Sequence, residues 1–157
     1  MERSSFEDLM LALDELKEFD CHGHHSSEEI SSAEQYLGVS LPNSFKRYLK
    51  EFGNMAFGHV EYLGLTKSSD FSSAGFPNFV WFNLRKREQE NFPDYLIIFR
   101  SVNDEIFLCL DTSKKIDDDD CVITIWSNLD KHVERELEIG FNSFLIGDIE
   151  EYIDLMQ

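Results

Sequence analysis

The spacing of apolar residues changes twice along this chain, and these changes limit the folds it can adopt. Up to Gly53 the apolar residues recur at the spacing of amphipathic helices. Between residues 59 and 139 they form short strand-like runs separated by polar turns, and from Phe141 the helical spacing returns. Because there is no repeat and no linker, we expect residues 1–157 to form a single α+β domain, with helices first, strands in the middle and a helix last.

Capping signals mark the three helices expected before Gly53. Two S-x-x-E boxes, Ser4 with Glu7 and Ser26 with Glu29, predict helix N-termini, and glycines predict two of the ends. The expected starts and ends of these helices are, in chain order, Ser4 and Phe19, Ser26 and Gly38, and Pro42 and Gly53.

The middle of the chain alternates strand-like runs with polar segments. Gly64 interrupts the first run, which predicts a bulge or a close backbone approach at that position. Asn103-Asp104 between two later runs predicts a hairpin, whereas residues 67–78 and 111–120 are polar and are expected to be loops. Strands are expected at 59–65, 95–99, 105–110 and 121–126, a short strand or a turn at 132–139, and a helix at 79–90.

The chain is strongly acidic, with 14 Lys and Arg against 31 Asp and Glu and a formal net charge of −17. A phosphate-binding protein needs a cationic surface and an anionic membrane repels an acidic one, so neither nucleic acid nor a membrane is expected as a partner. Residues 101–157 hold 4 basic and 15 acidic groups, a net charge of −11. This concentration suits a basic protein partner.

The run Asp117-Asp118-Asp119-Asp120 is open to more than one interpretation. It is typical of a solvated loop that keeps a protein soluble, and also of a surface that steers a basic partner. A calcium site is a weaker alternative because the run lacks the glycine and the terminal glutamate of an EF-hand loop. The basic triplet Arg85-Lys86-Arg87 is expected to pair with acidic groups of the same molecule.

The tract Cys21-His22-Gly23-His24-His25 has the residue types of a zinc site. A metal needs three or four converging ligands, and no second cluster elsewhere in the chain supplies them, so we expect an exposed polar loop and no metal. The chain also lacks the G-x-S-x-G, P-loop, H-E-x-x-H and G-x-G-x-x-G motifs. His59 and His132 stand beside no nucleophile motif and are expected to be structural or surface histidines.

The three cysteines, Cys21, Cys109 and Cys121, are odd in number and show no C-x-x-C spacing, which is typical of reduced residues in a cytosolic protein. The first residues show no secretory signal, and no apolar run approaches the roughly 18 residues of a membrane helix. We therefore expect a cytoplasmic protein, in which Cys109 is a small core residue.

Several segments together resemble the SUKH superfamily. The stretch ISSAEQYLGVSLPNSFKRYL has a helix with an acidic residue, a Leu-Gly stop, a Leu-Pro pair and a helix with an aromatic-Lys pair, as in the opening motif of that superfamily. Later segments resemble its glycine-flanked strand, its Leu-Asp-Thr-Ser strand end, its Val-rich strand ending in Trp and the start of its last helix. These segments are, in the family's order, 30–49, 53–65, 108–114, 122–126 and 141–145.

The resemblance implies an α+β fold in which helices pack around a mixed, largely antiparallel sheet. It also implies a non-enzymatic function, and we expect no cofactor. Bacterial members of the superfamily are chiefly immunity proteins that neutralise a cognate toxin, often a nuclease, and eukaryotic members include cell-wall and signalling regulators. We therefore expect an immunity protein that binds a basic toxin domain; the alternative is a regulatory or scaffold module that binds an endogenous protein.

Most residues of the family motifs are apolar or glycine and are expected to maintain the scaffold. The contact surface should therefore lie at charged or large aromatic positions outside those motifs, or at their ends. A tryptophan in a strand is more often buried, which makes Trp126 the weakest of these candidates. The candidate partner-binding residues are Asp104, Glu105, Asp117, Asp118, Asp119, Asp120 and Trp126.

Overall fold

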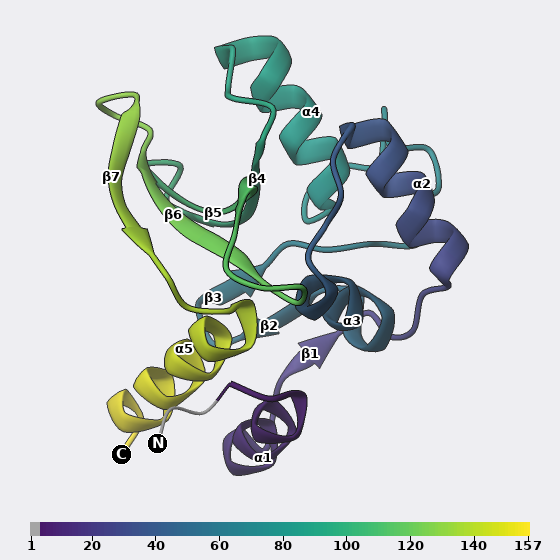
Figure 1. Ribbon diagram of the computed structural model, residues 1–157. Coiled ribbons are helices and arrows are strands. Elements are labelled where there is room, and N and C mark those ends of the chain that lie inside the picture. The colour runs from purple at the N-terminus through teal and green to yellow at the C-terminus, as the bar shows by residue number, and fades with distance from the viewer. Residues whose placement is uncertain (1–3) are drawn as a thin grey trace.

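The computed structural model describes residues 4–157, which form five helices and two antiparallel sheets (Figure 1). The α+β class expected from the sequence is confirmed. The strands are divided between a small sheet and a larger one instead of forming a single sheet. In chain order the elements are α1 (Phe6–Leu16), β1 (Asp20–Cys21), α2 (Ser27–Leu37), α3 (Asn43–Phe52), β2 (Met55–Phe57), β3 (Val60–Tyr62), α4 (Phe79–Glu90), β4 (Leu96–Val102), β5 (Ile106–Lys115), β6 (Cys121–Ser127), β7 (His132–Leu137) and α5 (Phe141–Leu155).

The capping box of α1 lies one residue later than predicted. The Ser5 hydroxyl accepts the Asp8 N–H at 3.0 Å, and the Asp8 carboxylate accepts the Ser5 N–H at 3.2 Å. The predicted pair of Ser4 and Glu7 is therefore wrong, because aspartate at the third helical position closes the box from Ser5.

The ends of the first helices follow from backbone conformation. α1 ends at Leu16 and not near Phe19, because Lys17 adopts a positive φ of 74° and cannot continue the helix. The predicted box of Ser26 is confirmed for α2, as is the stop at Gly38, whose φ of 70° suits glycine.

The small sheet has the order β1-β2-β3 and the larger one the order β4-β5-β6-β7. The single strand predicted over 59–65 is split, because the chain reverses at Gly58 and pairs β2 with β3. The polar stretch predicted over 111–120 is shorter than expected, because β5 continues to Lys115 and leaves a loop of residues 116–120.

Gly64 joins the two sheets to the end of α3. The Leu63 N–H donates to the Phe99 carbonyl of β4 at 2.8 Å, and the Leu65 N–H donates to the Gly53 carbonyl at 2.8 Å. Between them, a Cβ atom on Gly64 would lie only 1.7 Å from the Gly53 carbonyl oxygen. The close backbone approach predicted at this glycine is confirmed.

The helices enclose the sheets from several sides. α4 packs along one side of the larger sheet, with the Phe82 ring against Phe107, and α1 packs against α5 (Figure 1). At the centre, the buried Phe141 ring at the start of α5 contacts Phe45 of α3 and Phe99 of β4. The first and last helices are therefore fixed to the same core.

A buried polar group links β3, β4 and α5. The Tyr62 hydroxyl donates to the Asp148 carboxylate, and the Arg100 guanidinium lies 2.9 Å from the same carboxylate oxygen. The Arg100 and Asp148 side chains are each only 15% exposed. Burial raises the pKa of Asp148, which the bonds from Tyr62 and Arg100 only partly offset, and burial beside Asp148 raises the pKa of Tyr62.

Candidate functional site

Two turns lie side by side at one end of the larger sheet. The turn between β4 and β5 carries the predicted contact residues Asp104 and Glu105, and the turn between β6 and β7 spans residues 128–131. Asn128 joins them: its backbone N–H donates to the Glu105 carbonyl at 2.7 Å, and its side-chain amide donates to the Asp104 carbonyl at 2.9 Å. We name residues 103–105 and 126–133 the turn end.

The turn end exposes apolar side chains that the sequence analysis did not single out. Leu129 is 71% exposed and Val133 is 40% exposed. Val133 pairs across the sheet with Trp126, which is partly buried, packs its ring edge-to-face on Phe92 and leaves its Nε1 without a hydrogen-bond partner among residues 4–157. The available sequence signal was a leucine placed between Asn128 and Asp130 in a turn, where polar residues are usual.

The charges around the turn end are partly paired with one another. The Lys86 ammonium lies 3.2 Å from the Asp104 carboxylate and 2.8 Å from that of Glu90, and Lys131 binds Glu90 at 2.5 Å. Burial alone would lower the pKa of Lys86, but the bonds to these two carboxylates raise it overall. The pairing predicted for the basic triplet is thus confirmed for Lys86. The Glu105 carboxylate, in contrast, has no partner among the described residues.

The Asp117–Asp120 run lies at the opposite end of the same sheet. Asp117 Oδ1 accepts the N–H groups of Asp119 and Asp120, each at 2.9 Å. Asp120 Oδ1 accepts the Ser44 hydroxyl at 2.5 Å and the Phe141 N–H at 3.1 Å. Asp120 therefore stabilises the N-terminus of α5 and ties it to α3.

The side chain of Asn43, the first residue of α3, binds the middle of this loop. Its side-chain amide donates to the Asp118 carbonyl at 3.2 Å and to Asp119 Oδ1 at 3.1 Å. Within residues 4–157, only the carboxylate of Asp118 in this run has no hydrogen-bond or ion-pair partner. The predicted contact residues therefore fall into two separate groups, and in the loop group most carboxylates have roles within the fold.

The 21–25 tract is tied to α3 and is not simply an exposed loop. The N–H groups of Gly23 and His25 donate to the carbonyls of Phe52 and Lys50 at 2.9 and 3.0 Å. The His25 side chain is only 4% exposed and lies between two partners, with Nδ1 2.8 Å from the Glu29 carboxylate and Nε2 2.7 Å from His22 Nδ1. This difference from the predicted exposed loop arises because a helix end far from the tract in sequence covers His25.

While both histidines are neutral, this pair has one consistent set of proton positions. Because the Glu29 carboxylate only accepts hydrogen bonds, His25 Nδ1 donates to it, and His25 Nε2 then accepts from His22. Burial and the neighbouring His25 lower the pKa of His22, and the bond from His25 lowers the pKa of Glu29. Within residues 4–157, no group of three or more His, Cys, Asp or Glu side chains could hold a metal ion.

We expect this cluster to make the fold less stable in mild acid. Because the pKa of His22 lies below its unfolded value of 6.5, its contribution to stability is present above about pH 6.5 and is lost as the pH falls through the lowered value. The melting temperature of the His22→Gln variant should therefore drop less than that of the parent between pH 7.5 and pH 5. In His59→Gln, which changes an exposed histidine, the drop should match the parent, and equal drops in all three proteins would contradict the expectation.

Comparisons with known proteins agree with this fold. A protein-family model described as SMI1-KNR4 cell-wall, of the SUKH group, matches residues 9–147. A search of curated proteins finds no match. The chain is similar to a crystal structure of a protein from Pseudomonas syringae pv. tomato, with a TM-score of 0.60 and 16% identity, over 83% of this chain and 90% of the other. None of the helices described over residues 4–157 is both long and apolar enough to cross a membrane. Since the family model covers most of its length, the chain belongs to the SMI1-KNR4 family of the SUKH superfamily.

Proposed function

We propose that this protein is an immunity protein that binds a cognate toxin domain directly and neutralises it. The observation that carries the proposal is the exposed Leu129 at the turn end, beside the partly buried Trp126 and the Glu105 carboxylate, which has no partner within residues 4–157. An apolar centre with a charged rim is the usual composition of a protein-binding surface. This surface supports a protein-binding function better than the Asp117–Asp120 run, in which most carboxylates are already hydrogen-bonded within the fold.

The charge of the chain defines the kind of partner. A net charge of −17 attracts a basic protein over long distances and accelerates its association at low salt. Toxins that cleave nucleic acids need a basic groove for their substrate, so a basic nuclease domain suits such a surface. An acidic inhibitor can neutralise a toxin of this kind by covering the groove or the approach to it.

We place this activity in the cytosol, and the cysteines support that placement. Cys21, Cys109 and Cys121 are free thiols. Burial beside Asp111 and Asp120 raises the pKa of the Cys121 thiol to about 12, so it stays protonated and unreactive at neutral pH. A reducing compartment suits a chain with this pattern.

The proposal is tested by co-expressing the chain with the toxin domain encoded beside its gene. We expect the co-expressed pair to purify as a stable complex and the cells to survive a toxin that kills them when it is expressed alone. Survival without a complex would contradict direct binding, and a complex without survival would contradict neutralisation.

The contact surface is tested on the same pair by substitution. Leu129→Ala should weaken the complex by about tenfold or more, because a central apolar side chain is lost. Leu155→Ala, which shortens a leucine that is 68% exposed on α5, should leave the affinity unchanged. Isothermal calorimetry measures the affinity of both variants for the toxin domain. A larger loss of affinity in Leu155→Ala would show that the contact surface does not lie at the turn end.

Association rates can show which of the two groups of predicted acidic residues steers the toxin domain. Glu105→Gln should slow association by about twofold and flatten its salt dependence. Asp118→Asn removes the same charge at the other end of the sheet and should have a smaller effect. Surface plasmon resonance at two salt concentrations compares them, and the reverse order would favour the Asp117–Asp120 run.

A further inference from the structure

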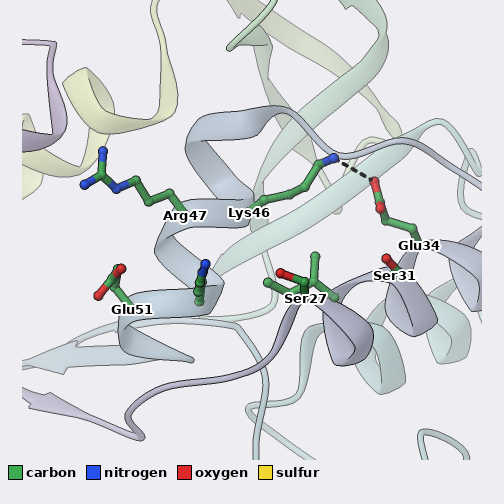
Figure 2. A pocket seen from close by; sticks show the side chains of 8 residues that line it. Ser27, Ser31, Glu34, Lys46, Arg47 and Glu51 are labelled. Carbon is green, nitrogen blue, oxygen red and sulfur yellow. Dashed lines mark ion pairs between the residues drawn. The ribbon is translucent and has the colours of Figure 1, made fainter.

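Three of the chain's few cations line one hollow between α2 and α3, which has a volume of about 460 Å³ (Figure 2). Lys46, Arg47 and Lys50 come from α3, and the hydroxyl-bearing Ser27 and Ser31 come from α2 on the opposite wall. This volume lies within the range of pockets that hold small ligands, about 300–1,000 Å³. We name this site the α2–α3 hollow.

Two of these cations have no anionic partner among residues 4–157. Lys46 lies 3.7 Å from the Glu34 carboxylate, which also accepts the Leu41 N–H at 2.7 Å. Arg47 lies over the Phe6 ring at 3.8 Å, and neither Arg47 nor Lys50 forms an ion pair with any residue from 4 to 157. In a chain with 31 carboxylate side chains, two neighbouring cations without an ion pair among residues 4–157 make this hollow suited to a negative group.

The other residues that line the hollow favour an acidic peptide over a phosphate ion. Glu34 and Glu51 lie at opposite ends of the hollow (Figure 2). A phosphate ion carries its negative charge in one compact group, which these two carboxylates repel, whereas a peptide offers backbone N–H donors to them and side-chain carboxylates to the cations. The hydroxyls of Ser27 and Ser31 can donate to either a carboxylate or a peptide carbonyl.

We propose that the α2–α3 hollow binds an acidic peptide segment of a protein partner, with glutamate or aspartate side chains held by Arg47 and Lys50. The proposal goes beyond the toxin-binding function, because it concerns a different surface and a segment of the opposite charge. The two proposals can therefore fail separately: one is measured with the toxin domain, the other with a peptide alone.

The test is a nuclear magnetic resonance titration of the full nitrogen-15-labelled chain at fixed ionic strength. The probe is the capped peptide acetyl-Glu-Gly-Glu-amide, and the controls are acetyl-Gln-Gly-Gln-amide and inorganic phosphate. We expect amide signals of residues 27–34 and 46–51 to shift to saturation with the glutamate peptide alone. Shifts that do not saturate, or that the glutamine peptide reproduces, would overturn the proposal, and saturation by phosphate at the same signals would assign the hollow to simple anions instead.

Substitutions then locate the binding groups. Lys50→Gln and Arg47→Gln should each weaken the glutamate peptide about fivefold, the loss expected for one exposed charge pair. Lys115→Gln, which removes an exposed cation at the end of β5, should leave the affinity unchanged. Because all three side chains are exposed, the variants should fold like the parent, which their amide spectra verify. If Lys115→Gln weakened peptide binding equally, the effect would come from the net charge of the protein, and the assignment to the hollow would be overturned.

Discussion

Gly64→Ala is expected to lower the free energy of unfolding by about 4 kcal/mol or more, enough to leave much of the protein unfolded. The added methyl group would lie 1.7 Å from the Gly53 carbonyl oxygen and 3.0 Å from the Asn54 Cα. Both contacts are backbone atoms, and the Gly53 carbonyl also accepts the Leu65 N–H, so the clash cannot be relieved without breaking that bond. Urea unfolding followed by circular dichroism measures the change.

Gly147→Ala is the matched control for this substitution. Gly147 lies within α5, and a Cβ atom added there meets nothing within 4 Å. Alanine should therefore stabilise the protein by about 0.5–1 kcal/mol through helix propensity alone. A stable Gly64→Ala protein would show that the junction between the sheets can separate, contrary to our description of it.

The second large effect is expected at Asp148. Asp148→Ala leaves the Arg100 charge buried and unpaired and removes the acceptor of the Tyr62 hydroxyl. Breaking one side of such a buried pair costs about 3–5 kcal/mol. Asp154→Ala, an exposed change on the same helix, should alter the free energy of unfolding by no more than about 0.5 kcal/mol.

A compensating variant separates the lost charge pair from lost packing. Replacing all three members by apolar residues, as in Tyr62→Phe with Arg100→Met and Asp148→Leu, removes every unpaired group at once. Because apolar replacements of buried ion pairs are often neutral, this triple variant should recover most of the stability lost in Asp148→Ala. If the triple variant is less stable than Asp148→Ala, the interactions within the polar group stabilise the fold by more than the desolvation of its members destabilises it.

Local features were the most predictable from the sequence. The α2 capping box at Ser26, the stop at Gly38 and the close approach at Gly64 depend on neighbouring residues or on the absence of a Cβ atom. The error at the start of α1 has the same origin, because Ser5 with Asp8 satisfies the capping pattern as well as Ser4 with Glu7, and spacing alone does not rank them.

Features that depend on distant partners were not predictable in this way. In the sequence the four aspartates of the 117–120 run look equivalent, yet Asp120 differs from Asp118 because Ser44 and Phe141 converge on it. Similarly, the 21–25 tract showed no sign that α3 would cover His25. The candidate surface at the turn end likewise depends on Asn128, which holds together two turns that are far apart in the sequence.

β7 is one of the two edge strands of the larger sheet, which has a consequence for keeping the protein in solution. An outer strand offers backbone groups to which a strand of another molecule can add, and charged side chains on both faces prevent this. In β7, Glu134, Arg135 and Glu136 are exposed and place charge on both faces. Replacing the two glutamates by glutamine would leave the strand less protected, so self-association of such a variant should begin at β7.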